Sequence, residues 1–157
     1  MLTVKRLVPS KGCDLYLVRT PEKAVVIDTG MFHCSPETVE TIRKELHGKA
    51  PDFVLLTHTH YDHVGGLPAI RTAFPGIKVY ASAYAAYVLQ RPGARKVMAQ
   101  LGLEAAKAYL GPDAVLEPYD EDLLFADEII AEGDEIDLGS RKLQVLETPG
   151  HTLCSLT

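Results

Sequence analysis

The feature that most constrains this chain is a strand-like apolar run that is followed directly by three histidines and an aspartate within six residues. Phe53–Thr57 reads Phe-Val-Leu-Leu-Thr, which is typical of a strand in a sheet covered on one or both faces. The next six residues are His58-Thr59-His60-Tyr61-Asp62-His63. A loop that leaves a buried strand can aim His58 and His60 at one ion and Asp62 and His63 at a neighbouring position. The spacing therefore favours a metal site over a solvated, histidine-rich loop.

Around this motif, strands and helices alternate along the chain. A strand is expected at Ala24–Asp28, and Ser35 is expected to cap a helix that runs to His47, with Pro36 in its first turn. A helix at Leu67–Phe74 and a strand at Ile77–Ala81 follow the motif. This alternation predicts a layered α/β arrangement.

Outer segments extend this pattern. Leu2–Val8 and Asp14–Arg19 are expected to form an antiparallel hairpin, because Pro9–Gly12 separates two β-rich runs. The stretch from residue 82 to 110 has a helical pattern that Pro92-Gly93 and Gly102 are expected to interrupt. Three further short strands are predicted at Glu128–Ala131, Glu135–Leu138 and Arg141–Thr148.

Length and charge narrow the class of protein. A chain of 157 residues is expected to form one domain, residues 1–157, with its own core. A net charge of -5 without a basic run disfavours a nucleic-acid partner. No apolar stretch approaches the ~20 residues that span a bilayer, and no signal-peptide core is present. Three cysteines, Cys13, Cys34 and Cys154, are expected to be free thiols in a reducing cytoplasm.

Four of the six histidines fall in two places, the motif and the turn Thr148-Pro149-Gly150-His151-Thr152. Together with Val25-Val26-Ile27-Asp28-Thr29-Gly30, these segments resemble the metallo-β-lactamase superfamily, in its hydroxyacylglutathione hydrolase-like branch. The resemblance covers almost the whole chain in order and spacing. It implies an αββα four-layer sandwich of the α+β class, with metals at one edge where loops of both sheets meet.

The resemblance assigns roles residue by residue. It implies that His58, His60 and His151 hold a first metal ion and that Asp62 and His63 contribute to a second. Asp28 matches the acidic residue that supports the metal loops, although a plain turn role is the alternative. The bridging aspartate and last histidine of the family do not occur in this chain, so we expect a sandwich that is incomplete at its C-terminus.

The chemistry follows from the expected ligands. Three neutral histidines leave zinc with its full charge, so the pKa of a bound water falls to about 7 and hydroxide forms near neutral pH. Asp62 is expected to orient this nucleophile and take its proton. The second ion has two ligands here and is expected to bind weakly. Iron or manganese also suits such ligands.

Other candidate residues receive structural interpretations. Gly65 and Gly66 are expected to serve a tight turn, and the Tyr84, Tyr87 and Val88 stripe to face the core. Residues 82–127 are expected to form a helical insertion or lid beside the metals. The remaining candidates are residues of a surface loop (His33, Cys34), a helix end (His47), buried positions (Cys13, Cys154) and either pocket or core (Tyr61).

The leading functional hypothesis is a metal-dependent hydrolase that acts on a small thioester, lactone or ester. One alternative is a mononuclear iron persulfide dioxygenase, which shares the motif. A flavodiiron protein is disfavoured because a glutamate usually stands where this chain has His60. A nuclease is weakened by the acidic charge. The remaining alternative is a non-catalytic metal-binding fragment, which would self-associate through its unfinished second sheet.

Overall fold

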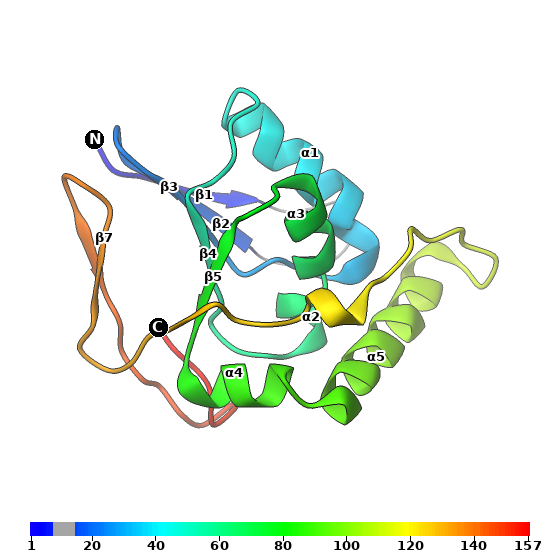
Figure 1. Ribbon diagram of the computed structural model, residues 1–157. Coiled ribbons are helices and arrows are strands. Elements are labelled where there is room, and N and C mark those ends of the chain that lie inside the picture. Colours follow the sequence, from blue (N-terminus) through cyan, green and yellow to red (C-terminus); the bar gives the residue numbers. More distant parts are fainter. Residues whose placement is uncertain (8–14) are drawn as a thin grey trace.

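The computed structural model describes residues 1–7 and 15–157 (Figure 1). Its larger sheet has six strands in the order β1-β2-β3-β4-β5-β6, and a second sheet pairs β7 with β8. The strands are β1 (Thr3–Leu7), β2 (Leu15–Arg19), β3 (Ala24–Ile27), β4 (Phe53–Leu55), β5 (Lys78–Ala81), β6 (Glu128–Ile129), β7 (Glu135–Asp137) and β8 (Lys142–Gln144). The helices are η1 (Phe32–Cys34), α1 (Ser35–Glu45), α2 (Tyr61–Val64), α3 (Leu67–Ala73), α4 (Ala83–Leu89), α5 (Pro92–Leu110) and η2 (Glu121–Leu123).

Strand directions in the large sheet follow from the connections. β1, β2 and β3 pair antiparallel, which confirms the predicted hairpin, although its turn at Pro9–Gly12 lies outside the described residues. β3, β4, β5 and β6 then pair parallel. A helix between successive strands, α1 and then α3, returns the chain to the start of the next parallel strand. The carboxyl ends of β3 and β4 therefore lie side by side at one edge.

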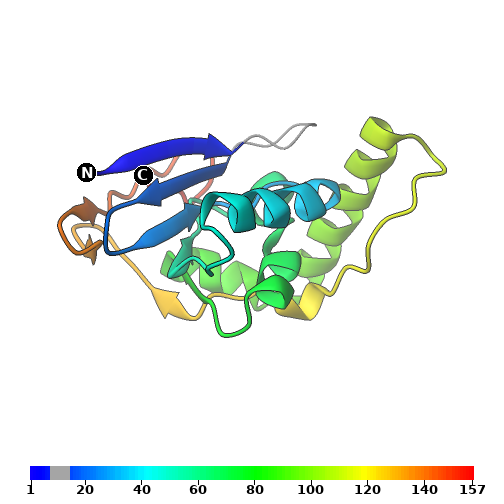
Figure 2. The same cartoon turned by 90° about the horizontal axis from the view of Figure 1, so that it is seen from above.

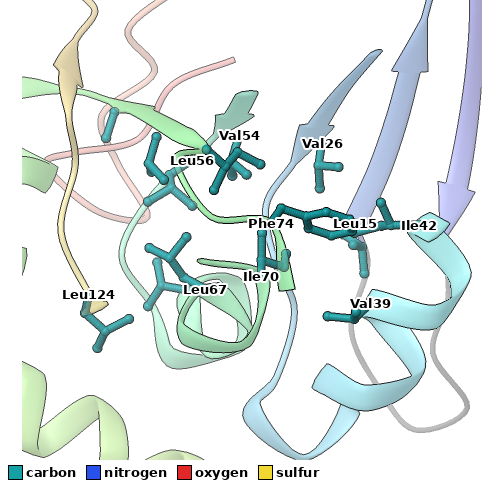
Figure 3. Close-up of a cluster of buried hydrophobic side chains, with 14 of the residues drawn as sticks. Leu15, Val26, Val39, Ile42, Val54, Leu56, Leu67, Ile70, Phe74 and Leu124 are labelled. Atoms are coloured by element: carbon teal, nitrogen blue, oxygen red, sulfur yellow. The ribbon is translucent and has the colours of Figure 1, made fainter. Parts of the chain in front are cut away.

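One face of the large sheet is covered by α1 and α3. Figure 3 shows side chains of the strands, among them Leu15, Val26 and Val54, directed at Ile42 of α1 and Ile70 of α3. All five of these residues are fully buried. Because burial of apolar surface is the main favourable term in folding, this layer fixes the part of the sheet that carries the motif.

The opposite face of the large sheet meets the second sheet. Val25, Phe53 and Leu55 of the large sheet pack with Ile136 of β7 and with Val145, just beyond β8. The outer face of the second sheet is polar and exposed at Glu135, Asp137, Lys142 and Gln144. The described residues thus supply a helical layer and two facing sheets of the predicted αββα sandwich (Figures 1 and 2).

Residues 82–127 hold α4, α5 and η2, and α5 lies at the end of the molecule far from β7 (Figures 1 and 2). The predicted interruption at Gly102 is wrong, since α5 runs through it and this buried glycine faces Phe32. The core assignment of Tyr84 and Tyr87 is also wrong, because both are exposed. A helical pattern identifies a face of a helix but does not say which face meets the core.

Helix α1 begins differently from the prediction. Ser35 is the first residue of the helix rather than its cap, and its hydroxyl donates back to the carbonyl of Phe32. The preceding turn η1 supplies this acceptor, so the local sequence signal was overridden by a neighbouring turn. Within the described ranges, no helix combines the length and apolar character needed to cross a membrane.

Candidate metal centre

Two strand ends and one returning loop bring the predicted site residues together. Asp28 follows β3, and His58 follows β4 after Leu56 and Thr57. Because β3 and β4 are parallel neighbours, both residues emerge at the same edge of the sheet. The chain beyond β8 reaches the same place, where the Leu156 N–H donates to the Thr57 carbonyl at 2.9 Å.

The three predicted ligands of the first metal ion converge. Each of His58, His60 and His151 offers a nitrogen, and these nitrogens lie within 4.8 Å of one another. Their rings stand edge to face, with centroids 4.6 to 5.1 Å apart. His58 is buried while His60 and His151 are exposed, so the cluster is closed on one side and open to solvent on the other.

A hydrogen-bonded chain sets the tautomer of His58. The Thr57 hydroxyl donates to Asp28 Oδ2 at 2.7 Å, and the same hydroxyl oxygen lies 3.0 Å from His58 Nδ1. Since the single hydroxyl proton goes to Asp28, His58 Nδ1 must be the donor of the second hydrogen bond. The neutral ring therefore carries its lone pair on Nε2.

This Nε2 atom is the strongest indication that the cluster binds a metal ion. It is buried and has no hydrogen-bond partner among the described residues. Buried polar atoms without partners are rare, and a metal ion would satisfy this one. Burial, with the nearby charge of His63, lowers the pKa of His58 to about 4, which keeps the ring neutral. The donor set and its protonation thus fit a divalent ion.

His60 shares this electrostatic character. Burial, and then the neighbouring charge of His151, lowers the pKa of His60 below its usual value, while Asp62 acts in the opposite direction. The neutral imidazole is the form that ligates metals, so His58 and His60 are both in the ligating form near neutral pH.

Asp28 holds the motif in place through hydrogen bonds to Thr57 and His63. This buried residue has a left-handed φ of 61°, which aspartate tolerates better than most residues. Its Oδ1 accepts from the Thr57 N–H at 2.8 Å, and its Oδ2 accepts from the Thr57 hydroxyl and lies 2.8 Å from His63 Nδ1. One carboxylate therefore positions both His58, through Thr57, and His63.

The residues predicted for a second metal ion are less complete. Asp62 and His63 lie in α2, and His63 Nε2 is 3.7 Å from Asp62 Oδ2. The ring of His63 lies 4.0 Å from that of His58, between centroids. Neither residue belongs to a group of three mutually close ligands within the part of the chain that the structure describes.

Two glycines allow the motif to lie against the loop that follows Asp28. A Cβ at Gly65 would stand 2.5 Å from the Tyr61 carbonyl oxygen and 2.6 Å from the Phe32 nitrogen. A Cβ at Gly66 would overlap the Thr29 carbonyl oxygen. Both glycines have ordinary negative φ values, so close backbone approach, and not the turn we predicted, is what requires them.

Cys154 links the loop of His151 to the loop of His58 and His60, and Ser82, between β5 and α4, also holds Cys154. Cys154 Sγ lies 3.5 Å from the Thr59 hydroxyl and 3.2 Å from that of Thr152, next to His151. Ser82 donates to the Cys154 carbonyl at 3.1 Å. Cys154 is buried, as predicted, whereas the role of Thr57 was not predicted, because its partner Asp28 lies 29 residues away.

The remaining candidates lie outside the cluster or at its edge. His47 is exposed beyond the end of α1, and His33 stacks on Tyr109 with ring centroids 5.3 Å apart. Cys34 is buried, contrary to its expected place in a surface loop, and Cys13 lies outside the described residues. Tyr61 is half-buried and packs against the core while also lining a cleft beside His60.

Comparison with known proteins identifies the family. Residues 10–157 match the model of the metallo-beta-lactamase superfamily. The chain belongs to this superfamily. A hydroxyacylglutathione hydrolase of Stenotrophomonas maltophilia is 28% identical over 82% of this chain and 34% of its own length. One of Photorhabdus laumondii is 32% identical over 69% of this chain and 29% of its own length.

Solved structures of the superfamily share the fold. A metallo-beta-lactamase of Novosphingobium pentaromativorans is 27% identical with a TM-score of 0.64, over 92% of this chain and 48% of that chain. A subclass B3 enzyme from a soil metagenome is 25% identical with a TM-score of 0.65, over 92% of this chain and 50% of that one. The predicted fold class is confirmed. This chain spans about half of the length of each of these solved structures and a smaller share of the length of each hydrolase relative.

Proposed function

We propose that this superfamily chain carries the metal-binding part of a hydrolase that acts on a small thioester, lactone or ester. The observation that carries the proposal is the convergence of His58, His60 and His151, with the buried His58 Nε2 lacking any partner among the described residues. A tri-histidine site with one open side is the arrangement that catalytic zinc uses.

His58, His60 and His151 would hold the ion in this proposal. When bound, zinc supplies a Lewis acid and lowers the pKa of water to about 7, and iron or manganese also suits these ligands. Asp28 and Thr57 hold the His58 proton at Nδ1, which leaves Nε2 available. Second-site residues Asp62 and His63 would bind a further ion weakly, because two ligands are too few for a tight site.

Asp62 is the residue to which we assign proton transfer. Its side chain is 38% exposed, and its charge acts directly on the pKa of His60. A carboxylate at the open side of the cluster can accept a hydrogen bond from an attacking water, orient it and take its proton. In the Asp62→Asn variant, hydrolysis would therefore fall while metal binding by the three histidines persists.

The relatives favour a thioester within this substrate class. Those reported above are named hydroxyacylglutathione hydrolases, and an acylglutathione is a thioester. We extend this substrate chemistry to the present chain as a proposal, because the chain spans only part of each relative. Residues 82–127 would act as an insertion or lid, since α5 lines a cleft beside His60.

The test combines metal content with turnover. We expect one tightly bound ion per chain as purified, by plasma mass spectrometry, and cleavage of at least one member of a panel of thioesters, lactones and esters. His151→Ala should lower zinc affinity about 100-fold or more, since it removes one of three ligands. His47→Asn is the matched control, because it removes an exposed imidazole outside the cluster and asparagine tolerates the left-handed φ of 52° there.

Other results would redirect the proposal. Iron in place of zinc, with oxygen uptake in the presence of a persulfide, would favour the dioxygenase alternative. A bound ion without turnover of any substrate would favour the non-catalytic alternative, which the two-residue second site motivates. Equal zinc affinity in His151→Ala and the unaltered chain would contradict the tri-histidine site itself.

A further inference from the structure

A cleft of about 670 Å³ opens beside the candidate metal centre. Thr59, His60 and Tyr61 form one side of it, and the other side comes from the end of α4 and the first half of α5. Its volume lies within the range of small-molecule sites. A molecule held in this cleft would therefore contact the same histidine that contributes to the metal cluster.

One face of α5 forms the apolar wall of the cleft. Ala94, Val97, Met98 and Leu101 line it, and their spacing of three, one and three residues places all four on one side of the helix. Met98 is buried, whereas Val97 is 55% exposed and Leu101 is 40% exposed. This face of α5 therefore lies toward Thr59, His60 and Tyr61 of the motif.

The polar groups of the cleft suit one part of a thioester substrate poorly. Within the described part of the chain no acidic side chain lines the cleft to pair with an ammonium group, and Arg91, which also donates to the Tyr87 hydroxyl at 2.8 Å, can pair with one carboxylate at most. A glutathionyl group carries two carboxylates and an amine, and an apolar wall cannot compensate the loss of their hydration. An aliphatic chain loses nothing polar on entering and gains from burial.

We propose, building on the hydrolase function above, that this cleft binds the aliphatic acyl chain of the substrate. The reacting carbonyl would lie at the His60 end, and the chain would run along Val97, Met98 and Leu101. From Ala94 to Leu101 the helix advances about 10 Å, which is about the length of an extended chain of eight carbons. The cleft thus selects medium-length acyl groups over acetyl.

Binding of the product carboxylates tests this selection without requiring turnover. Acetate, butanoate, hexanoate and octanoate are titrated into the zinc-supplied chain by calorimetry. Affinity should rise about twofold per added methylene, since full burial of a methylene would give about fourfold and the cleft is open on one side. In methyl NMR spectra, octanoate should shift the signals of Val97, Met98 and Leu101.

A matched pair of variants controls for unspecific binding. Leu101→Gln should weaken octanoate binding at least threefold and leave acetate unchanged. Leu103→Gln, at a position 42% exposed on the same helix but outside the cleft, should change neither. The acyl-chain assignment would be overturned by equal affinity for all four acids or by an equal effect of both variants. It would also be overturned if octanoate shifted the methyl signals of Ile136 and Leu143, between the two sheets, and not those of the cleft.

Turnover separates this inference from the function on which it rests. Chain-length-dependent binding without cleavage of any acyl thioester, lactone or ester would refute the hydrolase and leave the cleft assigned. Cleavage of acetyl and octanoyl thioesters at equal kcat/KM, together with binding that ignores chain length, would refute the assignment and leave the hydrolase.

Discussion

The two loops that supply the candidate metal ligands are held in different ways. His58 and His60 lie in a loop that the large sheet fixes from beneath, through buried Asp28 and through glycines packed against the chain after β3. His151 lies in an exposed loop closed by its own turn, where the Gly150 N–H donates to the Thr152 carbonyl at 3.2 Å. The first pair of ligands is thus positioned by the core, and the third depends on a few polar contacts.

Substitutions in the two loops should therefore differ in how they affect the free energy of unfolding and the metal affinity. Changes beneath the first loop disturb buried backbone and buried charge, so they should lower the free energy of unfolding as well as metal binding. Changes in the second loop should act mainly on metal binding, because the loop lies at the surface.

Gly66→Ala should have the largest effect. Its Cβ would overlap the Thr29 carbonyl oxygen, and neither backbone can yield without breaking the contact between the Gly66 N–H and the Gly30 carbonyl. We expect a loss of about 4 kcal/mol or more in unfolding free energy, or failure to fold. Chemical denaturation followed by circular dichroism measures it.

Gly93→Ala is the control for this variant. It adds the same methyl group in the first turn of α5, where nothing lies within 4 Å. Alanine favours a helix over glycine by about 0.5 to 1 kcal/mol, so stability should stay constant or rise slightly. Equal behaviour of the two variants would show that the close approach beneath the motif does not constrain the fold.

Asp28→Asn should have the next largest effect. An amide can accept hydrogen bonds on one side only, so either the Thr57 N–H or the pair formed by the Thr57 hydroxyl and His63 faces a second donor. We expect a loss of about 2 to 4 kcal/mol, the cost of buried unpaired donors. Zinc affinity should fall too, because Thr57 would no longer fix the tautomer of His58.

A matched control uses an exposed aspartate. Asp52 accepts the Ala24 N–H at 2.7 Å but lies at the surface at the other end of β4. Asp52→Asn should cost about 1 kcal/mol or less and leave zinc affinity unchanged. If Asp28→Asn lowered stability no more than this control, the buried carboxylate would not be what holds the first loop.

The parts of the site that are local in the chain could be predicted from the sequence. The apolar run of β4, the histidines directly after it and the family resemblance predicted that His58, His60 and His151 converge. The role of Thr57 could not be predicted, since a threonine at a strand end has no pattern that reveals a partner 29 residues away. Gly65 and Gly66 were found for the wrong reason, because packing against a distant backbone leaves no mark in the local sequence.

The stability of the metal-free chain should depend moderately on pH, because His58 in the first loop is buried. Burial lowers the pKa of His58 to about 4. In the unfolded chain the value returns to about 6.5, so below that pH the unfolded state takes up a proton that the folded state resists. Stability should therefore be full above pH 6.5 and decline as the pH falls toward 4.

Thermal unfolding across this range, with a chelator present, measures the decline. The slope should shrink in His58→Asn, which removes the titrating group and keeps a side-chain amide beside Thr57. It should persist in His47→Asn, because His47 is exposed. A midpoint that stays constant from pH 6.5 to 4 in the unaltered chain would contradict a buried, neutral His58.

Cys154→Ala should have the smallest effect on stability and the most selective effect on metal binding. The thiol contacts Thr59, between two ligands of the first loop, and Thr152, beside the ligand of the second. Its loss should cost about 1 kcal/mol of stability and about tenfold in zinc affinity, as for other groups that orient metal ligands.

Cys34→Ala removes an equally buried thiol away from the cluster, so it should cost similar stability and no affinity. Cys154→Ser keeps a hydrogen-bonding group between the threonines and should recover most of the affinity. If Cys34→Ala and Cys154→Ala weakened zinc binding alike, the effect would come from general loosening of the core, and the two loops would not be coupled through this side chain.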